Sequence, residues 1–258
     1  MMQQRVRRWL IVPAALAILI LGPVSVFAEA EWVYGKAINR SGELEFIEEH
    51  LIEYENERIV TIKTVYYDAD FNKIGEQVSD FAQGPQFGSY EFVDERLQYH
   101  DGAKVMSNQI LVYCRDIAAD GIKKKYLPRD SRQVVGQGFH QFIVANLDSL
   151  VRGAVISAKL VLPAQLDQFE IRIGKHKIEG NRIQVRIELD NWFLRLFTPH
   201  VEAEYDLTTR RLLSYRGLSM IADESGKTVE VTVSYDYPQQ RPMLSSRFSS
   251  TATSSDRN

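Results

Sequence analysis

The sequence contains only one cysteine, Cys114, among its 258 residues. A single thiol excludes a disulfide within the chain. Because it lies far from the apolar segment near the N-terminus, it also excludes the lipid-attached cysteine of a lipoprotein. Cys114 falls on the same face of an expected strand as Ile110 and Val112. We therefore expect a buried structural thiol, with a reactive thiol or an intermolecular disulfide as alternatives.

An excess of charge of one sign is also missing, because 31 basic and 34 acidic residues give a formal net charge of −3. Loss of the first 30 residues, argued below, would leave 28 basic and 33 acidic residues, a charge of −5. Such a chain lacks the basic stripe of nucleic-acid-binding proteins and the polybasic cluster that binds anionic lipid. We expect no nucleic-acid partner.

The motifs of common catalytic and cofactor sites are absent as well. The sequence has no G-x-S-x-G elbow, no Cys–His signature and no S-x-x-K motif. Gly136-Gln137-Gly138 precedes an expected helix, but it lacks the lysine and the hydroxyl of a phosphate-binding loop. We therefore name no catalytic residue and no cofactor, and an enzyme is the least favoured of three functional hypotheses.

Metal-binding spacing is likewise missing among the histidines. The five are His50, His100, His140, His176 and His200. None forms the H-x-x-x-H or H-E-x-x-H spacing that places two imidazoles on one helix face, so we expect no metal site. The acidic groups Glu48-Glu49 and Asp94-Glu95-Arg96 would form a polar cluster if their strands are neighbours. Paired carboxylates can serve acid–base chemistry, although cross-strand ion pairs are the commoner cause of such clusters.

The N-terminal 30 residues have the layout of a secretory signal peptide. Three arginines precede an uncharged, mainly apolar run over residues 9–22, which Pro23 interrupts. Small residues then offer cleavage after Ala28 or after Ala30. The run is barely long enough to cross a bilayer, so a permanent anchor is the less favoured alternative. We expect a periplasmic protein with no stable membrane span after cleavage.

The C-terminal residues 238–258 are mostly serine and threonine beyond residue 244 and lose the periodicity of the preceding segment. Such composition cannot bury enough apolar surface to offset the entropy lost on ordering, so we expect a disordered tail. Residues 31–237 show neither a tandem repeat nor a long linker. They are expected to form a single antiparallel β domain.

Strand patterns dominate residues 31–237. Val229, Val231, Val233 and Tyr235 alternate with polar residues, which is typical of a half-buried strand. Further candidates lie at 59–67, 74–81, 156–162, 169–173, 183–189, 201–207 and 211–219. Short polar turns separate many of them. Such connections favour antiparallel hairpins, since a parallel crossover needs a dozen or more residues.

Helical spacing occurs in one clear place. Apolar residues recur with a helical period over residues 139–152, and Gly153 is well placed to end the helix. A shorter apolar run, residues 192–197, is expected to form one or two helical turns before Pro199. Residues 43–54 suit a helix or a strand, and we favour a strand.

Geometry then limits the architecture. Nine or more strands at about 4.8 Å spacing make an open sheet about 40 Å wide or wider. The expected helix is about 21 Å long and about 10 Å across, too small to cover that face alone. The sequence therefore predicts a mainly β (α+β) fold, a curled antiparallel sheet or open half-barrel packed on one central helix.

Several short segments resemble a family of uncharacterised exported bacterial proteins. They are Glu48-Glu49-His50, Tyr67-Asp68, Asp80-Phe81, Pro85-Gln86-Phe87, Asp94-Glu95-Arg96, residues 138–142, residues 205–207 and residues 211–219. The resemblance implies one folded unit over most of residues 43–237 and no assigned activity. The order of elements is also similar to that of periplasmic lipoprotein carriers of the LolA/LolB type, which implies an open β-barrel with a helical lid but no function.

Three functional hypotheses follow. The first is a periplasmic protein that binds an apolar ligand, such as a lipid or acyl chain, in the concave face of the sheet. Its candidate pocket or lid residues are Phe139, Phe142, Ile143, Leu147, Trp192 and Phe193. The second is a non-catalytic structural or interaction protein of the cell envelope with a protein partner. The third is an enzyme.

Overall fold

The computed structural model describes residues 29–115, 121–191 and 200–241. Within them, fifteen strands form one sheet, in the order β8-β7-β6-β5-β4-β3-β2-β1-β15-β14-β13-β12-β11-β10-β9. The first eight are β1 (Glu29–Asn39), β2 (Leu44–Glu55), β3 (Arg58–Tyr67), β4 (Lys73–Asp80), β5 (Ser89–Asp94), β6 (Tyr99–Val105), β7 (Gln109–Arg115) and β8 (Lys123–Pro128). The others are β9 (Gln133–Val135), β10 (Val155–Leu162), β11 (Asp167–Glu179), β12 (Arg182–Leu189), β13 (Val201–Asp206), β14 (Leu212–Ala222) and β15 (Thr228–Asp236).

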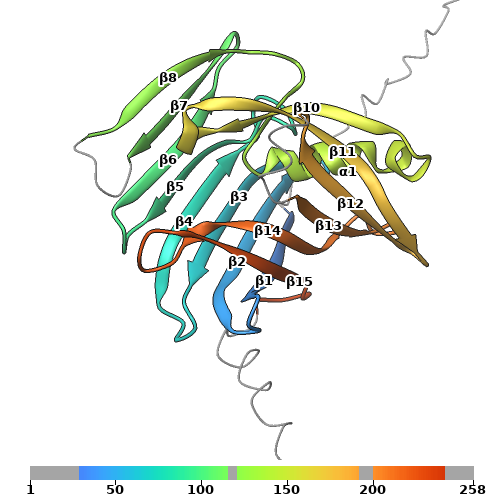
Figure 1. Cartoon of the computed structure of the whole chain (residues 1–258), viewed down its shortest axis with the longest axis horizontal. Helices are drawn as coiled ribbons and strands as arrows, with labels where there is room; N and C mark the ends of the chain where they lie inside the picture. The colour runs from blue at the N-terminus through green and yellow to red at the C-terminus, as the bar shows by residue number, and fades with distance from the viewer. Residues whose placement is uncertain (1–28, 116–120, 192–199, 242–258) are drawn as a thin grey trace, which may run out of the picture.

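Two antiparallel meanders make up this sheet. Strands β1 to β8 run outward in sequence order, and β10 to β15 run back until β15 pairs with β1. The short strand β9 pairs with β10 in parallel, the exception among the sheet's strand pairs. In Figure 1 the two meanders form two arms, the first made of β1–β8 and the second of β10–β15. The helix α1 (Gly138–Val151) lies between them. The prediction of a mainly β protein built on a curled antiparallel sheet with one central helix is confirmed.

The curl of the sheet follows from the chain connection between its two edges. Laid flat, fifteen strands would span about 67 Å at about 4.8 Å per strand. Yet the edge strands β8 and β9 are joined by residues 129–132, a link that can span only about 17 Å. The Lys125–Asp167 ion pair, with 3.2 Å between its N and O atoms, also joins β8 to β11. The sheet is therefore curled so that its two edges come close together, although β8 and β9 do not pair with each other.

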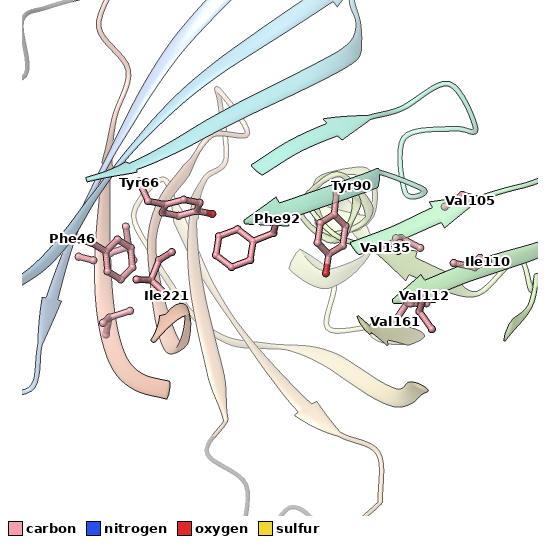
Figure 2. Packing of buried hydrophobic residues seen from close by; sticks show 14 of the residues in the cluster. Phe46, Tyr66, Tyr90, Phe92, Val105, Ile110, Val112, Val135, Val161 and Ile221 are labelled. Carbon is pink, nitrogen blue, oxygen red and sulfur yellow. The ribbon is translucent and has the colours of Figure 1, made fainter. Parts of the chain in front are cut away.

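Two clusters of buried apolar side chains fill this curl. The first cluster joins β1–β10 with β14 and β15 and includes Phe46, Tyr66 and Phe92. Figure 2 shows Phe92 between Tyr66 and Tyr90, and the rings of Tyr66 and Phe92 meet edge to face with centroids 5.8 Å apart. The second cluster packs Ile143, Leu147 and Leu150 of α1 onto β9–β13. The helix is thus the apolar plug of one arm only.

The first turn of α1 fits tightly against the loop between β4 and β5. A Cβ on Gly138 would lie 2.4 Å from the backbone oxygen of Gln86, and such contacts in a packed region cost about 1–3 kcal/mol. Replacing Gly138 with alanine should therefore lower the free energy of unfolding by about 2 kcal/mol in urea titrations. Gly174 is the control, because its Cβ would approach no atom closer than 3.6 Å. Equal stability of the two alanine variants would contradict this packing.

Candidate functional site

A line of mostly polar side chains, interrupted by Phe92, crosses the inner face of β2–β7. The register pairs His50 with Thr64, Thr64 with Gln77, Gln77 with Phe92, Phe92 with Asp101 and Asp101 with Cys114. We call these six residues the polar row. Gln77, Phe92 and Asp101 have exposed fractions of 1%, 1% and 5%. Residues that pair directly across neighbouring strands point to the same face of a sheet. All six side chains of the row therefore point to one side, into the first cluster.

One half of the row belongs to a hydrogen-bonded network. His50 Nε2 lies 3.0 Å from Glu48 Oε2, and His50 Nδ1 lies 2.7 Å from Thr64 Oγ1. Gln137, which directly precedes α1, donates from Nε2 to Thr64 Oγ1 at 2.9 Å and accepts from Ser79 Oγ at 2.8 Å. These bonds tie the start of the helix to β2, β3 and β4. The network therefore fixes the position of the start of α1 relative to strands β2, β3 and β4.

The order carboxylate, imidazole, hydroxyl in Glu48, His50 and Thr64 is that of an activated nucleophile. Thr64 is fully buried, however, and its oxygen already contacts both His50 and Gln137. The hydroxyl is therefore a structural link between His50 and Gln137. The arrangement acts as a strut between strands and helix.

His140, in the first turn of α1, lies next to this network. Its ring stacks on the ring of Tyr205 with centroids 5.5 Å apart, and its Nδ1 lies 3.3 Å from the Tyr205 hydroxyl. Burial, with a smaller contribution from the charge of His50, lowers the pKa of His140 to about 4. The imidazole is therefore neutral across the range in which histidines usually titrate.

An NMR titration checks this assignment. The ring signals of His140, identified by their loss in a His140→Gln variant, should titrate with a midpoint of about 4. A midpoint of 6 or higher would show that the ring is solvated and that its burial against Tyr205 is wrong.

The other half of the row is less completely bonded. Tyr99 donates its hydroxyl to Asp101 Oδ2 at 2.8 Å, and Cys114 Sγ lies 3.7 Å from the same hydroxyl. Among the described residues, Asp101 Oδ1 and Gln77 Oε1 have no hydrogen-bond partner. Burial raises the pKa of Asp101 to about 6, against the lowering effects of the Tyr99 hydrogen bond and the nearby His100.

The candidate ligand residues predicted from the sequence separate into three groups. Ile143 and Leu147 are each 1% exposed and belong to the second cluster. Phe139 and Phe142 pack against that cluster but stay partly exposed. Trp192 and Phe193 lie outside the described residues. The structure therefore brings the four helix residues together around one cluster.

The acidic groups that the sequence suggested as one cluster lie apart. β3 and β4 separate β2 from β5. Glu48 faces His50, whereas its neighbour Glu49 accepts hydrogen bonds from Tyr34 and from Arg241 at 2.8 Å each. Asp94 instead pairs with Arg96 at 2.7 Å. The carboxylates of Glu48, Glu49 and Asp94 therefore have separate partners and do not form one cluster.

The described part of the chain contains no group of three or more histidine, cysteine or acidic side chains that could hold a metal ion. Nor does it contain a helix long and apolar enough to cross a membrane.

Comparison with known proteins gives one distant structural likeness. No protein-family profile matches the sequence, and no match is found among curated proteins. Among solved structures, the chain is similar to a β-barrel-like protein of the domain of unknown function DUF1849 from Brucella abortus. The identity is 8%, the TM-score is 0.40, and the match covers 81% of this chain and 97% of the other. These comparisons do not show the similarity to lipoprotein carriers.

Sequence reasoning missed the polar row and its network. On β2 the inner positions read Phe46, Glu48 and His50, so polar residues stand where a core strand should be apolar. The same pattern occurs on β3 and β4, where the polar residues Thr64 and Gln77 occupy inner positions. These polar residues at inner positions are the sequence feature that could have indicated the row. Only the register shows that these residues are neighbours.

Proposed function

We propose that this protein is an exported, non-catalytic binding protein that holds an apolar chain inside the curled sheet. The observation that carries the proposal is a set of aromatic side chains that face the interior yet are only partly buried. Tyr215 and Tyr235 stand on the same face of β14 and β15 as the buried Val231 and Val233. Phe139 and Phe142 of α1 pack against the second cluster, and both also stay partly exposed.

A ligand that covers partly exposed aromatic side chains on the inner side of a sheet gains binding free energy. Burying apolar surface contributes about 25 cal/mol per Å², and small-molecule sites are mostly apolar with a few placed polar groups. The interior contains both kinds of side chain, because the polar row lies within the first cluster. An acyl chain is the ligand class that matches this combination.

Export to the periplasm remains part of the proposal. Cleavage after Ala28 would leave β1 whole. Cleavage after Ala30 would remove Glu29 and Ala30, which pair with Tyr54 and Glu53 of β2. We therefore favour Ala28 as the last residue of the signal peptide.

A dye-binding titration tests the proposed function. N-phenyl-1-naphthylamine, which fluoresces in dry apolar sites, should bind the mature protein saturably and be displaced by 1-monolauroylglycerol. A Phe139→Ser variant should bind the dye about tenfold more weakly, because it removes about 1.5 kcal/mol or more of apolar contact. Tyr126→Ser, at a side chain 59% exposed, is the control and should change the affinity little. Absence of saturable binding would reject the proposal.

The second candidate is an interaction protein of the cell envelope. Leu218 and Met220, two positions apart on the outer face of β14, are 44% and 51% exposed. This part of β14 also extends beyond the residues that pair with β13. A protein partner recovered in stoichiometric amount, and lost in a Leu218→Ser/Met220→Ser variant, would favour this candidate over ligand binding.

A further inference from the structure

Two buried acceptor oxygens without partners lie in the same row of the sheet. Gln77 Oε1 and Asp101 Oδ1 flank Phe92, one on each neighbouring strand. The third such atom in the described residues, Arg186 Nε, belongs to a side chain that already bonds Glu202. Both unpaired acceptor oxygens of the first arm thus lie in the same row, on either side of Phe92.

Leaving such groups unmet is costly. A buried polar atom without a partner costs about 1–3 kcal/mol, and more for a charged group, so most buried polar groups in proteins are hydrogen-bonded. The Tyr99 hydroxyl occupies only Oδ2 of Asp101, and Ser79 occupies only one end of the Gln77 amide. Each side chain therefore has one buried heteroatom without a hydrogen-bond partner among the described residues.

We propose that Gln77 and Asp101 bind the head of an amphipathic ligand whose head group donates hydrogen bonds, as an alcohol or an amine does. This inference rests on the proposed function and specifies its ligand. The strands that carry the two side chains are separated by β5 and so lie about 10 Å apart. Phe92 lies between the two side chains in the register, so a head of glycerol or amino-alcohol size with two donors would reach both oxygens by displacing the Phe92 ring.

The charge of Asp101 gives the site its selectivity. The carboxylate attracts an ammonium group and accepts from a hydroxyl, but it repels the carboxylate of a free fatty acid. The neighbouring Phe92, Tyr66 and Tyr90 are buried apolar contacts for the first carbons of the chain. The ligand class is therefore a monoacylglycerol or a long-chain amine, with fatty acids discriminated against.

Three probes of equal chain length test this selectivity. 1-Monolauroylglycerol, dodecylamine and laurate, each below its critical micelle concentration, are titrated at pH 8 into ligand-free mature protein in calorimetry. The first two should bind at least about tenfold more tightly than laurate, since a hydrogen bond to a charged group contributes about 1.5–3 kcal/mol. The hydroxyl and ammonium probes also separate the two head-group chemistries from each other.

Variants at the row complete the test. Asp101→Leu should bring the three affinities within about twofold of one another, and Asp101→Asn should weaken dodecylamine more than 1-monolauroylglycerol. The matched control is Glu91→Leu on the neighbouring strand β5, at a 59% exposed side chain, which should keep the selectivity. Urea titrations confirm that each variant is folded.

The outcomes separate the two proposals. If none of the three probes binds, the proposed function fails. If laurate binds wild-type protein as tightly as the other probes, or if Asp101→Leu keeps the selectivity, the donor-head inference fails while the proposed function stands.

Discussion

Replacing Leu147 with alanine is expected to lower the free energy of unfolding by about 3 kcal/mol. Leu147 is 1% exposed and belongs to the cluster that joins α1 to β9–β13. Truncation of a buried leucine loses the transfer energy of its methyl groups and leaves a cavity, at a cost of about 2–5 kcal/mol. The middle of that range applies because strands of the sheet hold the surrounding side chains in place. Urea unfolding followed by circular dichroism measures the change.

The adjacent residue provides the control for that substitution. Asp148, on the exposed side of α1, forms an ion pair with Arg210 at 2.8 Å, and its side chain is 68% exposed. Exposed ion pairs contribute about 1 kcal/mol or less. Asp148→Ala should therefore change stability by less than about 1 kcal/mol. A similar loss in both variants would mean that α1 is not packed as a plug.

Replacing Asp101 with asparagine is expected to change the difference in unfolding free energy between pH 4 and pH 8 by about 3 kcal/mol. The pKa of Asp101 rises from 3.8 to about 6 in the folded protein because the carboxyl is buried. The folded state then binds the proton more tightly than the unfolded state, so this group lowers stability as the pH rises from about 4 to about 6. Above pH 6 the full cost remains, because a difference of one in pKa between the folded and unfolded states corresponds to about 1.4 kcal/mol.

Asparagine carries no such cost. The stability of Asp101→Asn relative to ligand-free wild-type protein should therefore be about 3 kcal/mol more favourable at pH 8 than at pH 4. His140 acts in the opposite direction, since its lowered pKa reduces stability as the pH falls from 6.5 to about 4. Both proteins share His140, so its effect cancels in the difference. A difference that is the same at pH 4 and pH 8 would contradict the buried carboxylate.

Much of the fold could be predicted from the sequence, because many strands have one apolar face. The alternation at Ile183–Leu189 and Val229–Tyr235 corresponds to β12 and β15. The helical spacing over 139–152 corresponds to α1, Gly138–Val151. The ambiguous segment 43–54 is the strand β2, whose inner position Phe46 and outer position Ile47 are both buried. An apolar run that is buried on both faces does not distinguish a strand from a helix.

Strands that break the alternation were not predicted. β8 begins with three exposed lysines, Lys123 to Lys125, a composition that protects a sheet edge from pairing with other chains. β6 carries Asp101 on its inner face, where the pattern of a core strand requires an apolar residue. β1 starts inside the segment predicted as a signal peptide. The exposed lysines of β8 and the buried Asp101 of β6 therefore depart from the period-two pattern by which strands are predicted.

The candidate site was predicted only in its apolar part. Helical periodicity finds Ile143 and Leu147, because both lie on the stripe that packs against the sheet. It cannot find Gln77 or Asp101, since their proximity depends on the register of β4, β5 and β6. That register is set by long-range strand pairing, and the short polar segments themselves contain no sign of it.

Native mass spectrometry tests the central claim, binding of an apolar ligand inside the curled sheet. The protein would be purified without detergent from its native cells, weighed intact, and extracted with organic solvent. We expect an adduct at a ratio of one to one that dissolves in the organic phase and carries an acyl chain. A bare protein mass that stays unchanged after incubation with envelope lipids would contradict the account.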